Sequence, residues 1–240
     1  MPATNEVKNS TATDSAWLRP SLDKAPRLQV ETMPWGFRYA ALRTPIERAD
    51  THVYVRTTLF IAPFTVLIPP TDQYNLAQML VPIDDVNCMF YWIAWHETRG
   101  ISQDAWRKFC AAEVDVDLDR NFRKLRNASN GYMQDRDAMK LGDFTGIRGI
   151  PTQDMAMWES MGAIVDRTRD HLGTSDRAIV LFRKQMVAAA RSIAAGVTPF
   201  GTEGPGPGRS ALRSFEGMMP KSADWRTLGG NCDTPAAGEI

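Results

Sequence analysis

The stretch "RLQVETMPWGFRYAALRT", residues 27–44, decides the fold class of this chain. Two strand-like runs flank a turn at Pro34–Gly36, a pattern typical of a β-hairpin. In the second run, Arg38, Ala40 and Leu42 fall on one face, because successive side chains of a strand point to opposite sides. The stretch therefore predicts the beginning of an antiparallel sheet.

Further apolar runs extend this sheet along the chain. The run "HVYVRTTLFIAPFTVLIPP" (52–70) predicts one long strand or two bent strands. The runs "YNLAQMLVPI" (74–83) and "CMFYWIAWHE" (88–97) predict more strands, separated by the turn-forming "DDVN". Residues 27–96 are therefore expected to form a curved antiparallel sheet.

The period of the apolar residues changes after Ser102, from that of strands to that of helices. Helices are predicted over "SQDAWRKFCAAEV" (102–114), "QDMAMWESMGAIVDRTRDHLG" (153–173) and "SDRAIVLFRKQMVAAARSIAAG" (175–196). Strands followed by helices indicate an α+β fold. We expect the long helix that starts near Ser175 to pack across the concave face of the sheet.

The chain is expected to form one main domain with two extensions. Residues 1–26 are polar and punctuated by proline, and they predict a loop segment. Residues 27–199 hold the predicted strands and helices. Residues 200–240 begin with the glycine- and proline-rich "GTEGPGPG" and predict a carboxy-terminal arm without a core of its own.

Composition excludes several classes of function. Among 240 residues, 28 Lys and Arg balance 28 Asp and Glu, which disfavours nucleic acid and anionic membrane surfaces as partners. The longest apolar run, from Leu59, is short and broken by Pro63, so it predicts no membrane span. The polar amino terminus does not resemble a secretion signal, and three dispersed cysteines suit reduced thiols. These features predict a soluble cytoplasmic protein.

Asp154 attracts attention because it lies in the apolar opening of a predicted helix, in "FTGIRGIPTQDMAMWESMG" (144–162). An acid at a helix start can accept backbone hydrogen bonds and complement the helix dipole. The alternative is a metal ligand. The residues around Asp154 leave both roles open.

Several strings together resemble one family. They are "PRLQVE…GFRYAALR", "YVRTTLFIAPFTVLIPP", "PIDD", "AWRKFC", "QDRDAMK", "FTGIRGIPTQDMAMWESMG" and "LRSFEGMMPK". In this order they look like the catalytic domain of Rieske-type non-haem iron oxygenases, in the branch of phthalate 4,5-dioxygenase oxygenase (alpha) subunits and similar aromatic hydroxylases and O-demethylases. The resemblance covers the chain from about Trp17 to Trp225.

The resemblance implies a helix-grip (START/Bet v 1-like) domain that holds mononuclear iron(II) with two histidines and one carboxylate. Asp154 matches the carboxylate position and is the expected metal ligand and catalytic residue. Two imidazoles and a carboxylate on one face of iron(II) leave positions open for O₂ chemistry. The implied reaction is hydroxylation or O-demethylation of an aromatic acid or methoxy-aromatic compound, with electrons from a reductase or ferredoxin-type donor. Relatives often form homo-trimers.

The chain departs from the family pattern in two respects. A Rieske [2Fe–2S] cluster needs paired cysteine and histidine motifs, and this sequence contains neither. The mononuclear site needs two histidines close together on one helix, but His52, His96 and His171 are far apart. We therefore expect this chain to resemble the carboxy-terminal half of an oxygenase subunit, to begin just past the histidine ligands, and to be inactive alone.

Three residues are candidates for substrate binding. Relatives that act on phthalate hold its carboxylates with arginine, which makes Arg19 and the mid-strand Arg56 candidates for that role, with surface or ion-pair roles as the alternative. Trp158, one helical turn after Asp154, could line a pocket or belong to the core. Two other functions stay open for the chain: a non-catalytic helix-grip module that binds an aromatic ligand, and a structural companion to a separately encoded Rieske half.

Overall fold

The computed structural model describes residues 21–69, 74–202 and 212–228, and these residues form two compact units. The first, here called the sheet unit, comprises residues 21–93 and 171–228 of the described chain. The second, here called the α3 unit, comprises Ala94–Asp170. The range 27–199, predicted to hold the main domain, includes residues of both units.

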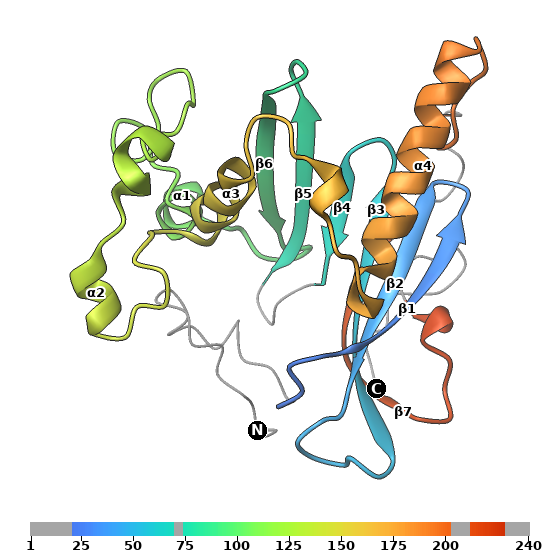
Figure 1. Cartoon of the computed structure of the whole chain (residues 1–240). Helices are drawn as coiled ribbons and strands as arrows, with labels where there is room; N and C mark the ends of the chain where they lie inside the picture. Colours follow the sequence, from blue (N-terminus) through green and yellow to red (C-terminus); the bar gives the residue numbers. More distant parts are fainter. Residues whose placement is uncertain (1–20, 70–73, 203–211, 229–240) are drawn as a thin grey trace. The chain divides into compact units, whose positions relative to one another are not determined.

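The sheet unit is built on seven antiparallel strands. They are β1 (Arg27–Met33), β2 (Gly36–Arg43), β3 (His52–Ile61), β4 (Thr65–Ile68), β5 (Asn75–Pro82), β6 (Cys88–Trp95) and β7 (Phe215–Pro220). Their spatial order is β1-β2-β3-β4-β5-β6, with β7 also paired to β3 (Figure 1). The predicted hairpin at residues 27–44 is confirmed, since Arg38 pairs with Glu31 and Ala40 with Gln29.

Strand β3 pairs with two strands along the same edge. Its first half, His52–Thr57, pairs with β7, and its last residues, Leu59–Ile61, pair with β4. The 52–70 run is therefore two strands joined by a tight turn. Strand β7 was not predicted, because "FEGMMP" is short and follows a glycine- and proline-rich segment. Residues 212–228 add Leu212, Met219 and Trp225 to the core of the sheet.

Helix α4 (Arg177–Ala194) packs on one face of the sheet, as predicted for the helix near Ser175 (Figure 1). Ala178 belongs to a buried cluster with Phe37 and Phe60, against which Leu181, Phe182 and Met186 pack. The Phe60 and Phe182 rings meet edge to face with centroids 5.0 Å apart. The α+β arrangement of an antiparallel sheet crossed by a long helix is confirmed.

The opposite face of the sheet carries a second core. Ala40, Leu42, Val55 and Met219 pack against Trp225 on the short helix Trp225–Thr227. Strand alternation explains this division, because Phe37 and Tyr39 point to the α4 face while the even-numbered residues of β2 point away from it. The carboxy-terminal segment therefore covers the side of the sheet that α4 leaves open.

The α3 unit contains short helices joined by hydrogen-bonded loops. They are α1 (Gln103–Cys110), α2 (Arg136–Lys140) and α3 (Ile150–Ser160). Ser102 caps α1 at the predicted start of the helix, but the helix ends at Ala111 in the left-handed region and does not reach Val114. The predicted helix over 153–173 is wrong beyond Ser160, because the chain leaves the helix at Gly162 with φ +91°.

Some predictions fall at or beyond the limits of the described chain. Residues 21–26 form no helix or strand, and the rest of the predicted loop segment, including Arg19, lies outside the described residues. Cys110 is buried, and burial raises its thiol pKa to about 12, whereas Cys88 is exposed. Within the described residues, no helix is both long and apolar enough to cross a membrane.

Candidate functional site

The start of α3 excludes a helix-capping role for Asp154. The helix begins after Gly149, has Pro151 in its first turn and contains no acid there, so Asp154 is its fifth residue. Gly149 has φ +81°, and a Cβ at this position would lie 2.5 Å from the Cβ of Ala111 and 2.6 Å from the carbonyl oxygen of Cys110. Only glycine therefore fits where α3 departs from the end of α1.

The Asp154 carboxylate is half-buried and has no hydrogen bond or ion pair with any described residue. Burial raises the pKa of its carboxyl above the ordinary 3.8. An acid that is removed from water without a compensating partner destabilises the fold, and such groups are concentrated at functional sites. The observation fits a carboxylate kept free for a ligand, and one of its oxygens could serve as a single donor to a metal.

A network of charged groups fixes the loop that leads into α3. Asp117, with a side chain only 1% exposed, accepts hydrogen bonds from Arg126 Nη1 at 2.5 Å and Arg148 Nη1 at 3.4 Å. Arg148 also pairs with Glu113 at 2.8 Å, and the backbone N–H of Glu113 donates to Asp117. Since Arg148 directly precedes Gly149, the network holds the amino end of α3.

The carboxyl end of α3 is also held in place. Glu159 forms an ion pair with Lys124 and accepts a hydrogen bond from the Tyr132 hydroxyl at 3.0 Å. Gln153, beside Asp154, donates to the carbonyl oxygen of Ile147 at 2.8 Å. Asp154 therefore lies on a short helix that is anchored at both ends.

Trp158 follows Asp154 by four residues, so the two side chains lie on neighbouring positions of one face of α3. Trp158 is 36% exposed and Met157 is 62% exposed. Both side chains are more exposed than those of core residues. Trp158 could therefore contact a bound molecule beside Asp154.

The three histidines have separate surroundings. The ring nitrogens of His96 form hydrogen bonds within its own turn, to Thr98 and Arg99. His52 Nδ1 lies 2.8 Å from the Thr51 hydroxyl, and His171 is exposed outside any helix. Among the described residues, no three His, Cys, Asp or Glu side chains form a group that could hold a metal.

Arg56 lies on the α4 face of the sheet unit, where it pairs with Glu216 of β7 at 3.1 Å. Glu216 also accepts a hydrogen bond from the buried Tyr54 hydroxyl. This ion pair explains how the charged side chain of Arg56 is accommodated in the middle of a strand. Arg56 and Asp154 belong to different units, each of which is described by itself.

Comparison with known proteins identifies the family. A family model described as "LigXa C-terminal domain like" matches residues 1–237. The chain belongs to this family. It is 50% identical over 221 residues, 92% of its length, to the phthalate 4,5-dioxygenase oxygenase subunit of Pseudomonas putida. It is 34% identical over 222 residues, 85% of its length, to the 3-chlorobenzoate-3,4-dioxygenase oxygenase subunit of Comamonas testosteroni.

These relatives confirm the resemblance seen in the sequence, which was to the carboxy-terminal catalytic domain of such oxygenase subunits. The chain spans about half the length of the curated relatives that it matches, since the alignments cover 50% of each. The activity of the full-length relatives is therefore assigned to this LigXa-like chain only as a proposal.

Sequence reasoning found Asp154 but missed the residues that fix α3. Asp117 lies in "DVDLD", where alternating acids look like a solvated loop. Its burial depends on Arg126 and Arg148, which are 9 and 31 residues away in sequence. The glycine of "IRGIP" was the available signal, because a glycine directly before a helix can mark a close backbone approach.

The raised pKa of Asp154 predicts a pH-dependent stability. The folded chain keeps the proton to higher pH than the unfolded chain, so the free energy of unfolding falls as pH rises from about 3.8 through the raised value. Asp154→Asn removes this effect. We expect the variant to be more stable than the natural chain at pH 7 in urea titrations, and the difference to vanish near pH 3. A variant less stable at pH 7 would contradict this account.

Proposed function

We propose that this chain is the catalytic-domain portion of a Rieske oxygenase that hydroxylates or O-demethylates an aromatic acid with O₂ at mononuclear iron(II). The observation that carries the proposal is the half-buried, unpartnered carboxylate of Asp154. The 50% identity to a phthalate 4,5-dioxygenase oxygenase subunit supports it. Phthalate and 3-chlorobenzoate, which appear in the relatives' names, indicate aromatic acids as the substrate class.

The proposed iron site combines Asp154 with two imidazoles from outside these 240 residues. The sequence has three histidines, and the described ones are not grouped with Asp154. The [2Fe–2S] cluster of such enzymes likewise needs cysteine and histidine motifs that this sequence does not contain. Iron held by two imidazoles and one carboxylate supplies O₂ activation. Asp154 contributes the anionic oxygen that offsets the charge of the metal.

The remaining roles belong to substrate binding. Trp158 offers an aromatic surface one turn from Asp154. Arg56 has Nε committed to Glu216, and its terminal nitrogens have no hydrogen bond with a described residue, so they could bind a carboxylate of the substrate. Arg19 is proposed for the same role from the family resemblance alone. We assign the working enzyme to the cytoplasm, with a reductase or ferredoxin-type donor and a homo-trimeric assembly.

A second candidate function is a binding module that holds an aromatic ligand without iron. The packing of α4 across an antiparallel sheet favours it, because this arrangement can enclose a small molecule without a metal. Binding of an aromatic acid by the metal-free chain, unchanged by Asp154→Asn, would favour this alternative.

The purified chain alone is expected to bind iron(II) weakly and to show no turnover with a reductase. One carboxylate does not hold iron(II) against water, and two imidazoles complete a facial site. Anaerobic titration with iron(II) and assays with phthalate as substrate test this expectation. Stoichiometric iron that is lost in Asp154→Ala, together with oxidation of an aromatic acid, would show that the dispersed histidines complete the site.

A further inference from the structure

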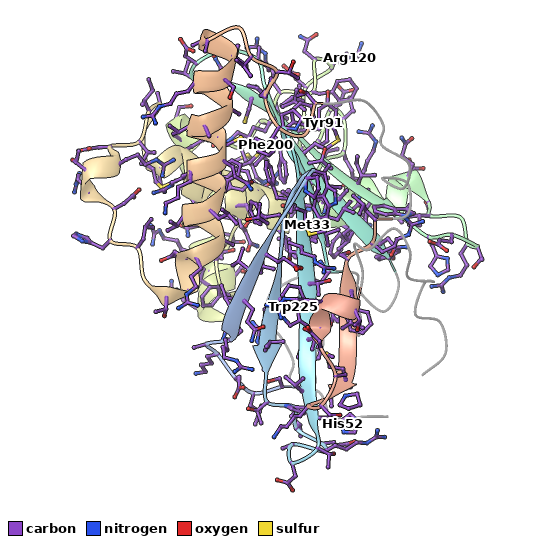
Figure 2. The ribbon with its side chains drawn as sticks, turned by 90° about the vertical axis from the view of Figure 1, so that its right-hand side faces the viewer. Met33, His52, Tyr91, Arg120, Phe200 and Trp225 are labelled. Atoms are coloured by element: carbon purple, nitrogen blue, oxygen red, sulfur yellow. The ribbon has the colours of Figure 1, made fainter. Side chains whose placement is uncertain are left out.

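A cleft of about 650 Å³ opens in the sheet unit, where β1, β2, β3 and β7 meet the turn that follows β7. Leu42, Met219 and Trp225 contribute apolar lining. Arg27 and Lys221 supply two cationic side chains. Figure 2 shows Trp225 beside the strands and His52 at the loop end of β3, and both residues line the cleft.

The cleft lies on the side of the sheet away from α4. Arg27 is the cross-strand partner of Leu42, so both point to the same face. Leu42 and Met219 belong to the core cluster with Trp225, whereas α4 packs on the face that carries Phe37 and Phe60. No residue of the α3 unit lines this cleft. It is therefore separate from the groups assigned above to iron and substrate.

The acids in the cleft wall have structural partners. Asp23 Oδ2 accepts the backbone N–H of Thr44 at 2.5 Å. Asp224 Oδ1 accepts the backbone N–H of Arg226 at 3.0 Å and its guanidinium at 3.1 Å. These hydrogen bonds hold the chain at the two sides of the cleft. The Asp23 carboxylate is therefore bound to the backbone, and the Asp224 carboxylate is bound to the backbone and partly neutralised by Arg226.

The cationic side chains of the cleft have fewer hydrogen-bond and ion-pair partners in the protein than the acidic side chains. The side chains of Arg27 and Lys221 form no hydrogen bond or ion pair with a described residue. Arg43 donates from Nε to the Asp23 carbonyl oxygen at 3.3 Å, and as the neighbour of Leu42 in β2 it points to the opposite face of the sheet, which also carries Arg56. The cleft therefore holds two cationic side chains, those of Arg27 and Lys221, that no described group neutralises.

We propose that the cleft binds a small oxyanion, a carboxylate or a phosphate, through Arg27 and Lys221. Guanidinium groups bind such oxygens in a bidentate manner, and a lysine adds a mobile point charge. Hydrogen bonds to charged groups are among the stronger polar contacts, so two cations in one cleft suit a ligand with two negative charges. The site is independent of the proposed oxygenase function.

Calorimetric titration of the full chain with three probes tests the proposal: succinate, its neutral analogue succinamide, and inorganic phosphate. Saturable binding of succinate, of phosphate, or of both supports the site and identifies the oxyanion, and succinamide should not bind. In the double variant Arg27→Ala/Lys221→Ala, affinity should fall by about tenfold or more. Neither side chain forms a hydrogen bond or ion pair within the described fold, so this variant should fold normally.

The matched control is Lys184→Ala/Arg191→Ala, which removes the same charge from exposed positions of α4. This control should bind as the natural chain does. Equal weakening in both double variants would show a general charge effect and overturn the proposal. Absence of saturable binding of either anion at millimolar concentration, or equal binding of succinamide, would also overturn it.

Discussion

Replacing Asp117 by alanine is expected to lower the free energy of unfolding by about 3–5 kcal/mol, because removing one partner of a buried ion pair leaves the other charge uncompensated. The Asp117 side chain is 1% exposed, and Arg126 and Arg148 both donate to it. The backbone N–H of Glu113 would lose its acceptor as well. Urea denaturation followed by circular dichroism measures the effect.

Asp137→Ala is a suitable control for this prediction. Asp137 is 86% exposed and pairs with Lys140 within one turn of α2, so its loss is expected to cost about 0.5 kcal/mol or less. If Asp117→Ala costs no more than this control, the network does not stabilise the α3 unit. The anchoring of α3 described above would then be wrong.

The second large effect is expected at Trp225. Truncating a buried tryptophan to alanine commonly costs about 3–5 kcal/mol. Trp225 is 3% exposed, packs against Leu42 and Met219, and donates from Nε1 to Gln29 at 2.6 Å. The guanidinium groups of Arg38 and Arg226 lie 5.4 and 5.0 Å from its ring centroid. Thermal and urea unfolding of Trp225→Ala should show this loss.

Two variants make the Trp225 prediction specific. Trp225→Phe keeps an aromatic ring and removes the bond to Gln29, so a smaller loss of about 1 kcal/mol is expected. Trp158→Ala should cost less than Trp225→Ala, because Trp158 is already 36% exposed. A Trp225→Ala variant as stable as Trp158→Ala would show that the carboxy-terminal segment does not stabilise the sheet.

Local sequence patterns predicted those parts of the fold whose partners are close in the chain. The hairpin of β1 and β2 was predictable because its alternation and its turn lie within 18 residues, and Arg38, Ala40 and Leu42 are buried together as expected. The helix α4 was predictable from its period and length. The pairing of β7 with β3 joins residues more than 150 apart, as in Arg56 with Glu216, and no local pattern reports such a pair.

In the candidate site, too, features with local signals could be predicted and features that depend on distant residues could not. Asp154 was found through its motif, and the position of the helix start then excluded the capping alternative. The helix was predicted to run to Gly173 because residues 161–172 retain apolar spacing, but Gly162 takes a left-handed conformation that ends it. The Asp117 network was not predictable, because its burial depends on tertiary contacts with Arg126 and Arg148.

The most direct measurement of the central claim, that Asp154 is the carboxylate ligand of mononuclear iron, is metal analysis of a fusion protein. In this fusion, the half of the Pseudomonas putida relative that this chain does not match is placed before the chain, and we propose that it supplies the cluster motifs and histidines. The fusion should contain about three irons per chain, two in the [2Fe–2S] cluster and one at the mononuclear site. The cluster serves as an internal standard for folding.

In the fusion, Asp154→Asn should lower the iron content to about two per chain, with the visible absorption of the cluster unchanged. Asp137→Asn, a solvent-exposed change in the same unit, should leave about three. This pair of results is what the account predicts. Retention of about three irons by the Asp154→Asn fusion, with its cluster intact, would show that another residue holds the metal and would contradict the account.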